Sequence, residues 1–108
     1  MKKVFVSVAV RGLNEEQTMA KHAECRQKIT DIIGEYEDIS DNVSDFHSGN
    51  VDEGVNCAPL WWFGKGLVNE LAYADLAVFY GDISQTRACK LEKEICELYD
   101  IPYIVIKV

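Results

Sequence analysis

Apolar residues gather in four short segments, and each segment predicts a strand. The run Lys3–Val10 (KVFVSVAV) is apolar or small at nearly every position and rich in β-branched residues, which is typical of a parallel strand covered on both faces. Asp75–Tyr80 and Tyr103–Val108 have the same character. Weak alternation around Ile39 and Val43 predicts a short edge strand between the first two helices.

Three segments between these strands have helical periodicity. The first is Glu15–Ile33, which follows the capping residue Asn14 and ends before Gly34. The other two are Ala58–Tyr73 and Arg87–Tyr99. Strands and helices therefore alternate along the chain.

This alternation predicts a three-layer α/β fold of the flavodoxin or Rossmann-like kind, with about four parallel strands in the order 2-1-3-4. A chain of 108 residues has room for one such domain, residues 1–108. The polar stretch His47–Asn56 is its longest loop. Ligands of such folds bind beyond the carboxyl ends of the strands where the strand order reverses, here between the loops Arg11–Asn14 and Gly81–Arg87.

The charge balance and the hydropathy exclude two classes of partner. Eleven Lys plus Arg against eighteen Asp plus Glu give a net charge of -7, which repels nucleic acid. No apolar run approaches the roughly 20 residues of a membrane-spanning helix, and the start Met1-Lys2-Lys3 does not lead into a signal peptide. We therefore expect a cytoplasmic protein without a membrane partner.

The four cysteines lack the spacing of a metal or disulfide framework. Cys25, Cys57, Cys89 and Cys96 form no CxxC pair, so we expect reduced, mostly buried thiols, no metal and no cofactor. Cys89 falls in the first turn of the last predicted helix, where the helix dipole favours a thiolate. A nucleophilic role for Cys89 is therefore an alternative hypothesis.

The chain lacks the glycine-rich fingerprints of dinucleotide, P-loop and serine hydrolase sites. It resembles the nucleoside 2-deoxyribosyltransferase-like family, especially its short stand-alone members. The resembling segments are Val4–Gly12 (VFVSVAVRG), Pro59–Gly66 (PLWWFGKG) and Ala74–Cys96 (ADLAVFYGDISQTRACKLEKEIC). The resemblance implies an enzyme that cleaves or transfers at the N-glycosidic bond of a nucleoside or nucleotide. A flavin mononucleotide binder of similar fold is a weaker hypothesis, because no Ser/Thr-rich run follows the first strand.

The resemblance implies that Glu92 is the nucleophile, through a family pattern like G-T-x-x-E-x-G-x-A in which Ala88 takes the place of the first glycine. A carboxylate there would stabilise, or bond to, the anomeric carbon as the base leaves. Periodicity does not separate Glu92 from Glu94, since both flank the predicted buried stripe and both suit a solvated helix face. That stripe consists of Ala88, Leu91, Ile95 and Leu98.

Two arginines flank the expected crevice. Arg11 and Arg87 suit an anionic group such as a 5'-phosphate, while a surface ion pair is the alternative for Arg11. The other residues that we expect at the substrate are Gly12, Tyr80, Asp82, Thr86 and Ala88. Thr86 stands where the family has a carboxylate and Ala88 where it has glycine, which leaves open a non-catalytic nucleotide-binding module.

The densest aromatic segment is Trp61-Trp62-Phe63. Three consecutive helical residues cannot all face one core, so at least one needs another surface. The alternatives are a contact between subunits and stacking on a base. We favour the subunit contact and expect a homodimer or larger homo-oligomer, as the resemblance also implies.

Overall fold

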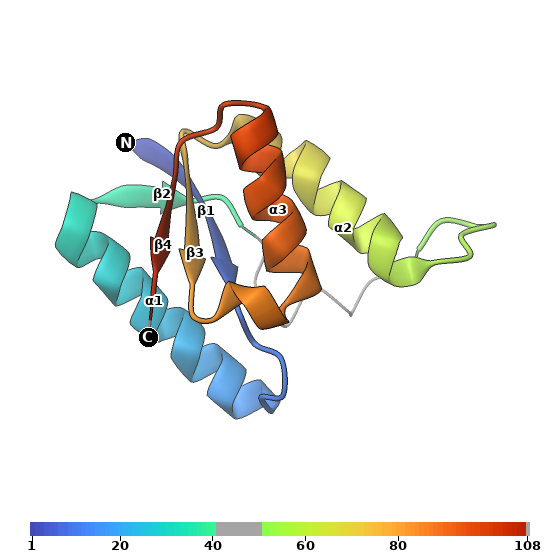
Figure 1. The fold of residues 1–108 in the computed structure, drawn as a ribbon, viewed down its shortest axis with the longest axis horizontal. Helices are drawn as coiled ribbons and strands as arrows, with labels where there is room; N and C mark the ends of the chain where they lie inside the picture. The colour runs from blue at the N-terminus through green and yellow to red at the C-terminus, as the bar shows by residue number, and fades with distance from the viewer. Residues whose placement is uncertain (41–50, 108) are drawn as a thin grey trace.

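The computed structural model describes residues 1–40 and 51–107 and has the predicted alternation of strands and helices (Figure 1). Its elements are β1 (Lys2–Val8), α1 (Glu15–Ile33), β2 (Tyr36–Asp38), α2 (Ala58–Asn69), the 3-10 turn η2 (Leu71–Tyr73), β3 (Leu76–Tyr80), the 3-10 turn η3 (Ile83–Gln85), α3 (Arg87–Leu98) and β4 (Tyr103–Ile106). Within the described ranges, no helix combines the length and the apolar character needed to cross a membrane.

The four strands form one parallel sheet in the order β2-β1-β3-β4. Val4 of β1 pairs with Leu76 of β3, and Ala77 of β3 pairs with Tyr103 of β4. The predicted α/β class, the parallel pairing and the strand order 2-1-3-4 are confirmed. The order reverses between β1 and β3, as the crevice rule requires.

Alternate residues of β1 face opposite layers of the fold. Val4, Val6 and Val8 belong to the core cluster beneath α1, which also contains Cys25 and Ile29. The intervening positions point to the other face, which α3 and the end of α2 cover. The sheet therefore separates two cores, one on each side (Figure 1).

The second core contains Phe5, Ala9, Leu71, Phe79, Cys89 and Cys96. Ser7 lies between Phe5 and Ala9 in β1 and is the polar position of this face, with 8% of its surface exposed. A buried hydroxyl requires a hydrogen-bond partner. Ser7 is therefore a buried polar residue in an otherwise apolar layer, and its hydroxyl needs a partner there.

The edge strand lies earlier than predicted. β2 covers Tyr36–Asp38, ahead of the expected centre, and the amide of Ile39 still donates to the carbonyl of Val4 at 3.0 Å. The Arg26 guanidinium bonds the Asp38 carboxylate at 2.7 Å and joins α1 to this strand. Val43 and residues 47–50 of the predicted loop lie outside the described residues, and residues 51–56 contain no helix or strand.

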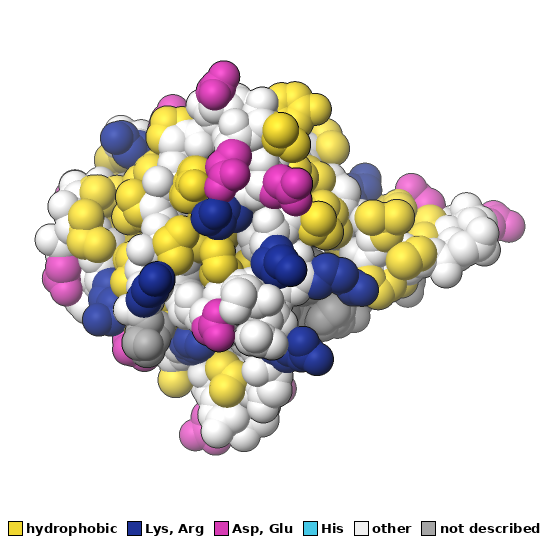
Figure 2. All heavy atoms as spheres, viewed as in Figure 1, with side chains coloured by type: hydrophobic (Ala, Val, Ile, Leu, Met, Phe, Trp, Pro, Cys, Tyr) yellow, Lys and Arg dark blue, Asp and Glu magenta, His cyan; other side chains and the backbone are white. Residues whose placement is uncertain are grey.

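The helix α2 is shorter than predicted. It ends at Asn69 rather than Tyr73, because Glu70 (φ -127°, ψ -68°) leaves the helical region before η2 begins. The break turns the consecutive residues Glu70 and Leu71 into the protein, with 7% and 2% of their surfaces exposed. No residue of α2 itself is buried, and Figure 2 shows apolar side chains gathered over this helix.

The predicted buried stripe of α3 is right for Ile95, which packs against the second core, and for the half-buried Ala88, but wrong for its two leucines. Leu91 and Leu98 are 42% and 73% exposed, whereas the buried residues of the helix are Cys89 and Cys96. The observed buried stripe is offset from the predicted stripe by about one residue, which corresponds to roughly 100° of rotation about the helix axis. Small cysteine side chains let α3 pack against the sheet, and this rotation carries Glu92 inward with them.

Candidate functional site

Glu92 lies on the face of α3 that packs on the sheet, between the buried residues Cys89 and Cys96. The Ser7 hydroxyl donates to Glu92 Oε1 at 2.7 Å. The same hydroxyl oxygen lies 3.1 Å from Cys89 Sγ. The strand β1 and the helix α3 thus hold a largely buried carboxyl group between them.

Burial raises the pKa of Glu92 to about 7 because the charged form loses its hydration. The Ser7 hydrogen bond opposes this by favouring the carboxylate, and the charge of Glu70 adds a smaller upward shift. At neutral pH both protonation states of Glu92 are therefore populated. A carboxyl group tuned in this way suits acid–base or nucleophilic chemistry.

Glu70 is a second buried acid that the sequence analysis missed. It reaches the interior because α2 breaks at this residue, and it lies close enough to Glu92 for its charge to affect that pKa. The sequence predicted an uninterrupted helix here. Nothing in the helical periodicity marks Glu70, because its burial depends on the break.

Cys89 does not have the properties of a nucleophile. It is 2% exposed, and burial raises the pKa of its thiol to about 11, with the Ser7 hydrogen bond opposing that shift and the charge of Glu92 adding to it. The thiol therefore stays protonated at neutral pH despite its place in the first turn of α3. Burial and the raised pKa of the thiol therefore speak against a nucleophilic role for Cys89.

The two loops at the carboxyl ends of β1 and β3 meet as predicted. Arg11 Nη1 donates to the carbonyl of Gln85 at 3.1 Å, which joins the loop after β1 to η3. Within the described residues Arg11 forms no ion pair, so the surface pairing considered for it is absent. Arg87 and Gly12 are exposed at the same edge.

Lys21 is a cation at this edge that the sequence analysis did not single out. Its Nζ reaches from α1 and donates to the carbonyl of Ala9 at 2.8 Å. It also lies beside Gly81, where an added Cβ would meet Lys21 Nζ at 3.0 Å. The switch point between β1 and β3 therefore has an ammonium group at its base.

Asp82 and Thr86 begin η3 and α3. Asp82 Oδ1 accepts from the amide and the hydroxyl of Ser84 at 3.2 Å and 2.5 Å, so this carboxylate acts as a turn residue. Thr86 occupies the N-cap of α3 without a side-chain cap bond, and its buried Oγ1 has no partner among the described residues. Ala88 is half-buried in the first turn.

Tyr80 lies apart from the rest of the expected set. It is fully buried in the core beneath α1, on the opposite face of the sheet from Glu92. Burial, and then the neighbouring Glu24, raise the pKa of Tyr80 to about 12. The structure does not bring Tyr80 together with Glu92.

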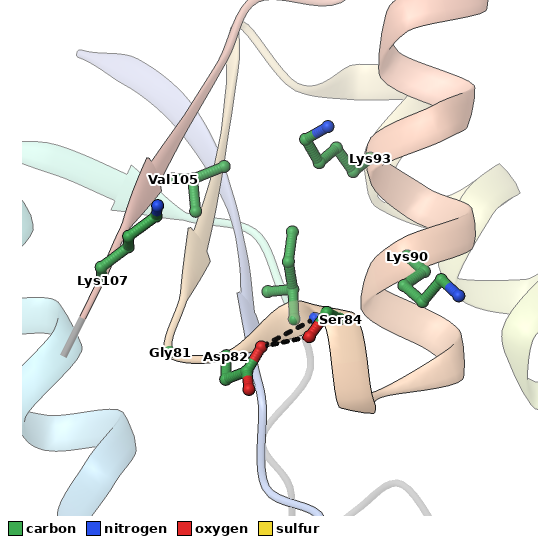
Figure 3. A pocket seen from close by; sticks show the side chains of 8 residues that line it. Gly81, Asp82, Ser84, Lys90, Lys93, Val105 and Lys107 are labelled. Carbon is green, nitrogen blue, oxygen red and sulfur yellow. Dashed lines mark hydrogen bonds between the residues drawn. The ribbon is translucent and has the colours of Figure 1, made fainter.

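A cavity of about 680 Å³ opens on the other flank of α3, beside the edge strand β4 (Figure 3). Gly81, Asp82 and Ser84 line it from the loop after β3, and Glu92 is not among its lining residues. In the described ranges, no three His, Cys, Asp or Glu side chains lie together as metal ligands would.

Comparison of the chain with protein-family models, with curated proteins and with solved structures found no significant match to any of them. The likeness to the nucleoside 2-deoxyribosyltransferase-like family thus rests on the three sequence segments alone.

The raised pKa of Glu92 predicts a specific pH dependence of stability. The unfolded chain titrates near 4.5 and the folded protein near 7, so the stabilisation from protonated Glu92 is complete below about pH 4.5 and is lost as the pH rises through 7. Glu92→Gln keeps an acceptor for Ser7 and removes the charge. At about pH 8 this variant should be more stable than wild type by on the order of 2 to 3 kcal/mol, and at about pH 4 equally stable.

Urea unfolding across this pH range measures the effect. Glu94→Gln is the matched control, because Glu94 is exposed on the same helix and its removal should give no such pH-dependent gain. If the stability difference between Glu92→Gln and wild type stayed constant with pH, burial would not raise the pKa of Glu92.

Proposed function

We propose that this protein binds a nucleoside or nucleotide at the carboxyl edge of β1 and β3 and cleaves or transfers its N-glycosidic bond through Glu92. One observation carries the proposal: a largely buried glutamate, held by Ser7 at 2.7 Å, has its pKa raised to about 7 beside the switch point of a parallel sheet. The resemblance to the deoxyribosyltransferase-like family implies the same residue independently.

The chemistry follows from the charge that develops on the sugar. As the C–N bond breaks, its electron pair goes to the base nitrogen, which takes up a proton, and the anomeric carbon gains oxocarbenium character. The ionised carboxylate of Glu92 stabilises this carbon or bonds to it. Water or a second base then attacks the anomeric carbon and releases the carboxylate.

Two neighbours of Glu92 influence the pH at which its carboxyl group ionises. The Ser7 hydroxyl donates to the carboxylate and favours the charged form, whereas the charge of Glu70 disfavours it. Arg11 and Arg87, exposed at the adjoining edge, would hold an anionic group of the substrate such as a 5'-phosphate.

The alternative is a module of the same fold that binds a nucleotide without turnover. It is favoured by Thr86 and Ala88, which replace a carboxylate and a glycine of the family pattern. It also fits the inward hydrogen bond from Ser7, which already occupies one oxygen of Glu92. The two functions differ in whether base is released.

We also propose that α2 pairs with α2 of a second copy of the chain. This twelve-residue helix buries none of its residues, and Leu60 and Val68 are 65% and 66% exposed. Trp61 and Trp62 stand edge to face at 4.7 Å on it, and Lys65 Nζ lies 5.0 Å from the Trp61 ring centre. A helix of this composition gains stability by covering such residues.

A cytoplasmic location fits the cysteines. All four are free, and Cys25, Cys89 and Cys96 are buried as thiols. Free buried thiols are typical of proteins that fold in a reducing compartment. The location is a proposal that rests on this observation.

Release of free base tests the enzymatic proposal. The purified protein is incubated with common nucleosides and their 5'-monophosphates, and the products are separated by chromatography. Glu92→Gln should lower the rate by roughly 100-fold or more, because the reacting carboxylate is lost. The control Glu94→Gln should keep the wild-type rate of base release. Absence of release, together with thermal stabilisation by a nucleotide, would favour the binding module.

The pH profile of that activity tests the roles of Ser7 and Glu70. If ionised Glu92 is required, the rate rises with pH through about 7. Glu70→Gln removes a negative charge and should move the rise to lower pH. Ser7→Ala removes the hydrogen bond and should move it to higher pH. Shifts of the same sign in both variants would contradict this arrangement.

The oligomeric state tests the proposed pairing of α2. Light scattering on the intact chain should report a dimer or larger assembly. Leu60→Asp on α2 should dissociate it, because a carboxylate would be buried in an apolar contact. The control Leu98→Asp changes a leucine of α3 that is at least as exposed as Leu60 and should leave the assembly intact. A wild-type monomer at high protein concentration would refute the pairing.

A further inference from the structure

The strand β4 is the last strand of the sheet, and no strand of the described residues pairs with its outer edge (Figure 1). The carbonyls of Pro102 and Ile106 accept hydrogen bonds of 2.9 Å from amides of β3 and of the residue after it. Backbone groups of successive strand residues point to opposite sides, so the N–H and C=O groups of Tyr103 and Val105 point outward. A sheet edge of this kind is a template for a further strand.

The side chains of β4 are also incompletely covered. Its sequence YIVI contains no charged residue, and all four residues are only half-buried, whereas every residue of β3 is buried. Proteins usually protect apolar edges with proline, lysine or a bulge. Here Pro102 and Lys107 stand at the two ends of β4, so they limit pairing to a short stretch without covering it.

We propose that β4 pairs antiparallel with β4 of a second copy of the chain, so that two four-stranded sheets join into one. A two-fold axis at Val105 places the two Val105 residues opposite each other, and each exchanges both backbone hydrogen bonds with its counterpart. The same register places Tyr103 opposite Lys107 of the second copy. This contact uses a different element from the proposed pairing through α2 and does not involve Glu92.

The side chains at this edge that face α3 decide what the second copy meets. Val105 and Lys107 line the cavity between β4 and α3 (Figure 3), and the Tyr103 hydroxyl donates to Glu97 of α3 at 2.9 Å. Directly opposite residues of antiparallel strands have their side chains on one face, with Cβ atoms about 4.5 to 5.5 Å apart. In the proposed pair, Lys107 of one copy therefore lies beside Tyr103 and Glu97 of the other.

Charge complementarity favours a second copy as the partner and selects this register. The Glu97 side chain is 47% exposed, and its bonds from Lys93 and Tyr103 both end on Oε1. Lys107 is exposed and forms no ion pair within the part of the chain that the structure describes. The two-fold axis creates two contacts between Lys107 and Glu97, whereas a register shifted by one residue would place Lys107 opposite Ile101.

Amide hydrogen exchange of the intact chain at low and high protein concentration tests the pairing. The Ile104 amide, on the side of β3, should exchange slowly at both concentrations. The outward amide of Val105 should exchange roughly tenfold more slowly at high concentration than at low, because pairing of so short an edge is weak and follows mass action. A Val105 amide that exchanges fast at every concentration would overturn the proposal.

Reversing one charge at a time tests the register. In Lys107→Glu two carboxylates meet at each contact, and in Glu97→Lys two ammonium groups meet, so each variant alone should associate roughly tenfold more weakly. An equimolar mixture should regain the Val105 protection, because opposite charges meet again at both contacts. Lys28→Glu reverses an exposed charge of α1 and should keep wild-type protection.

Two results of the charge reversals contradict the arrangement. They are a mixture that exchanges as fast as the separate variants, and an equal loss of protection in Lys28→Glu. The readout lies at β4 and requires neither base release nor pairing of α2. Failure of either earlier proposal is therefore distinguishable from failure of this one.

Discussion

The hydrogen bond from Ser7 to Glu92 is the interaction on which the arrangement of this protein depends. β1 must alternate its side chains between two cores, and Ser7 is the polar position on the face toward α3. A hydroxyl buried there needs an acceptor, and a carboxyl group buried there needs a donor. At 2.7 Å each satisfies the other, and α3 is thereby oriented with its cysteines, rather than its leucines, against the sheet.

The break in α2 has a comparable effect on the electrostatics. Because the chain leaves the helix at Glu70, this acid and Leu71 both turn inward, one beside the carboxyl group of Glu92 and the other into the core. Two acids buried near one another in an apolar layer shift the ionisation of at least one of them. The raised pKa of Glu92 is thus a property of three elements, β1, α2 and α3, and of none alone.

Acidic and basic chemistry occupy opposite flanks of α3. Glu92, with Ser7 and the nearby Glu70, lies toward β1, whereas Lys90 and Lys93 line the cavity beside β4. Residues that differ by one position on a helix face directions about 100° apart. A single helix therefore carries the buried carboxyl group of Glu92 on one side and lysine side chains on another.

The sequence by itself determined the α/β class, the parallel sheet and the strand order, because buried parallel strands and their crossover helices have strong local signatures in Lys2–Val8 and Leu76–Tyr80. It also located the crevice loops around Arg11 and Thr86. It could not place Glu70, Tyr80 or the buried face of α3. The position of Glu70 depends on the break in α2, that of Tyr80 on the sheet face its side chain meets, and the buried face of α3 on the rotation of the helix. Packing between segments that are distant in the sequence decides each of these, and the local pattern does not.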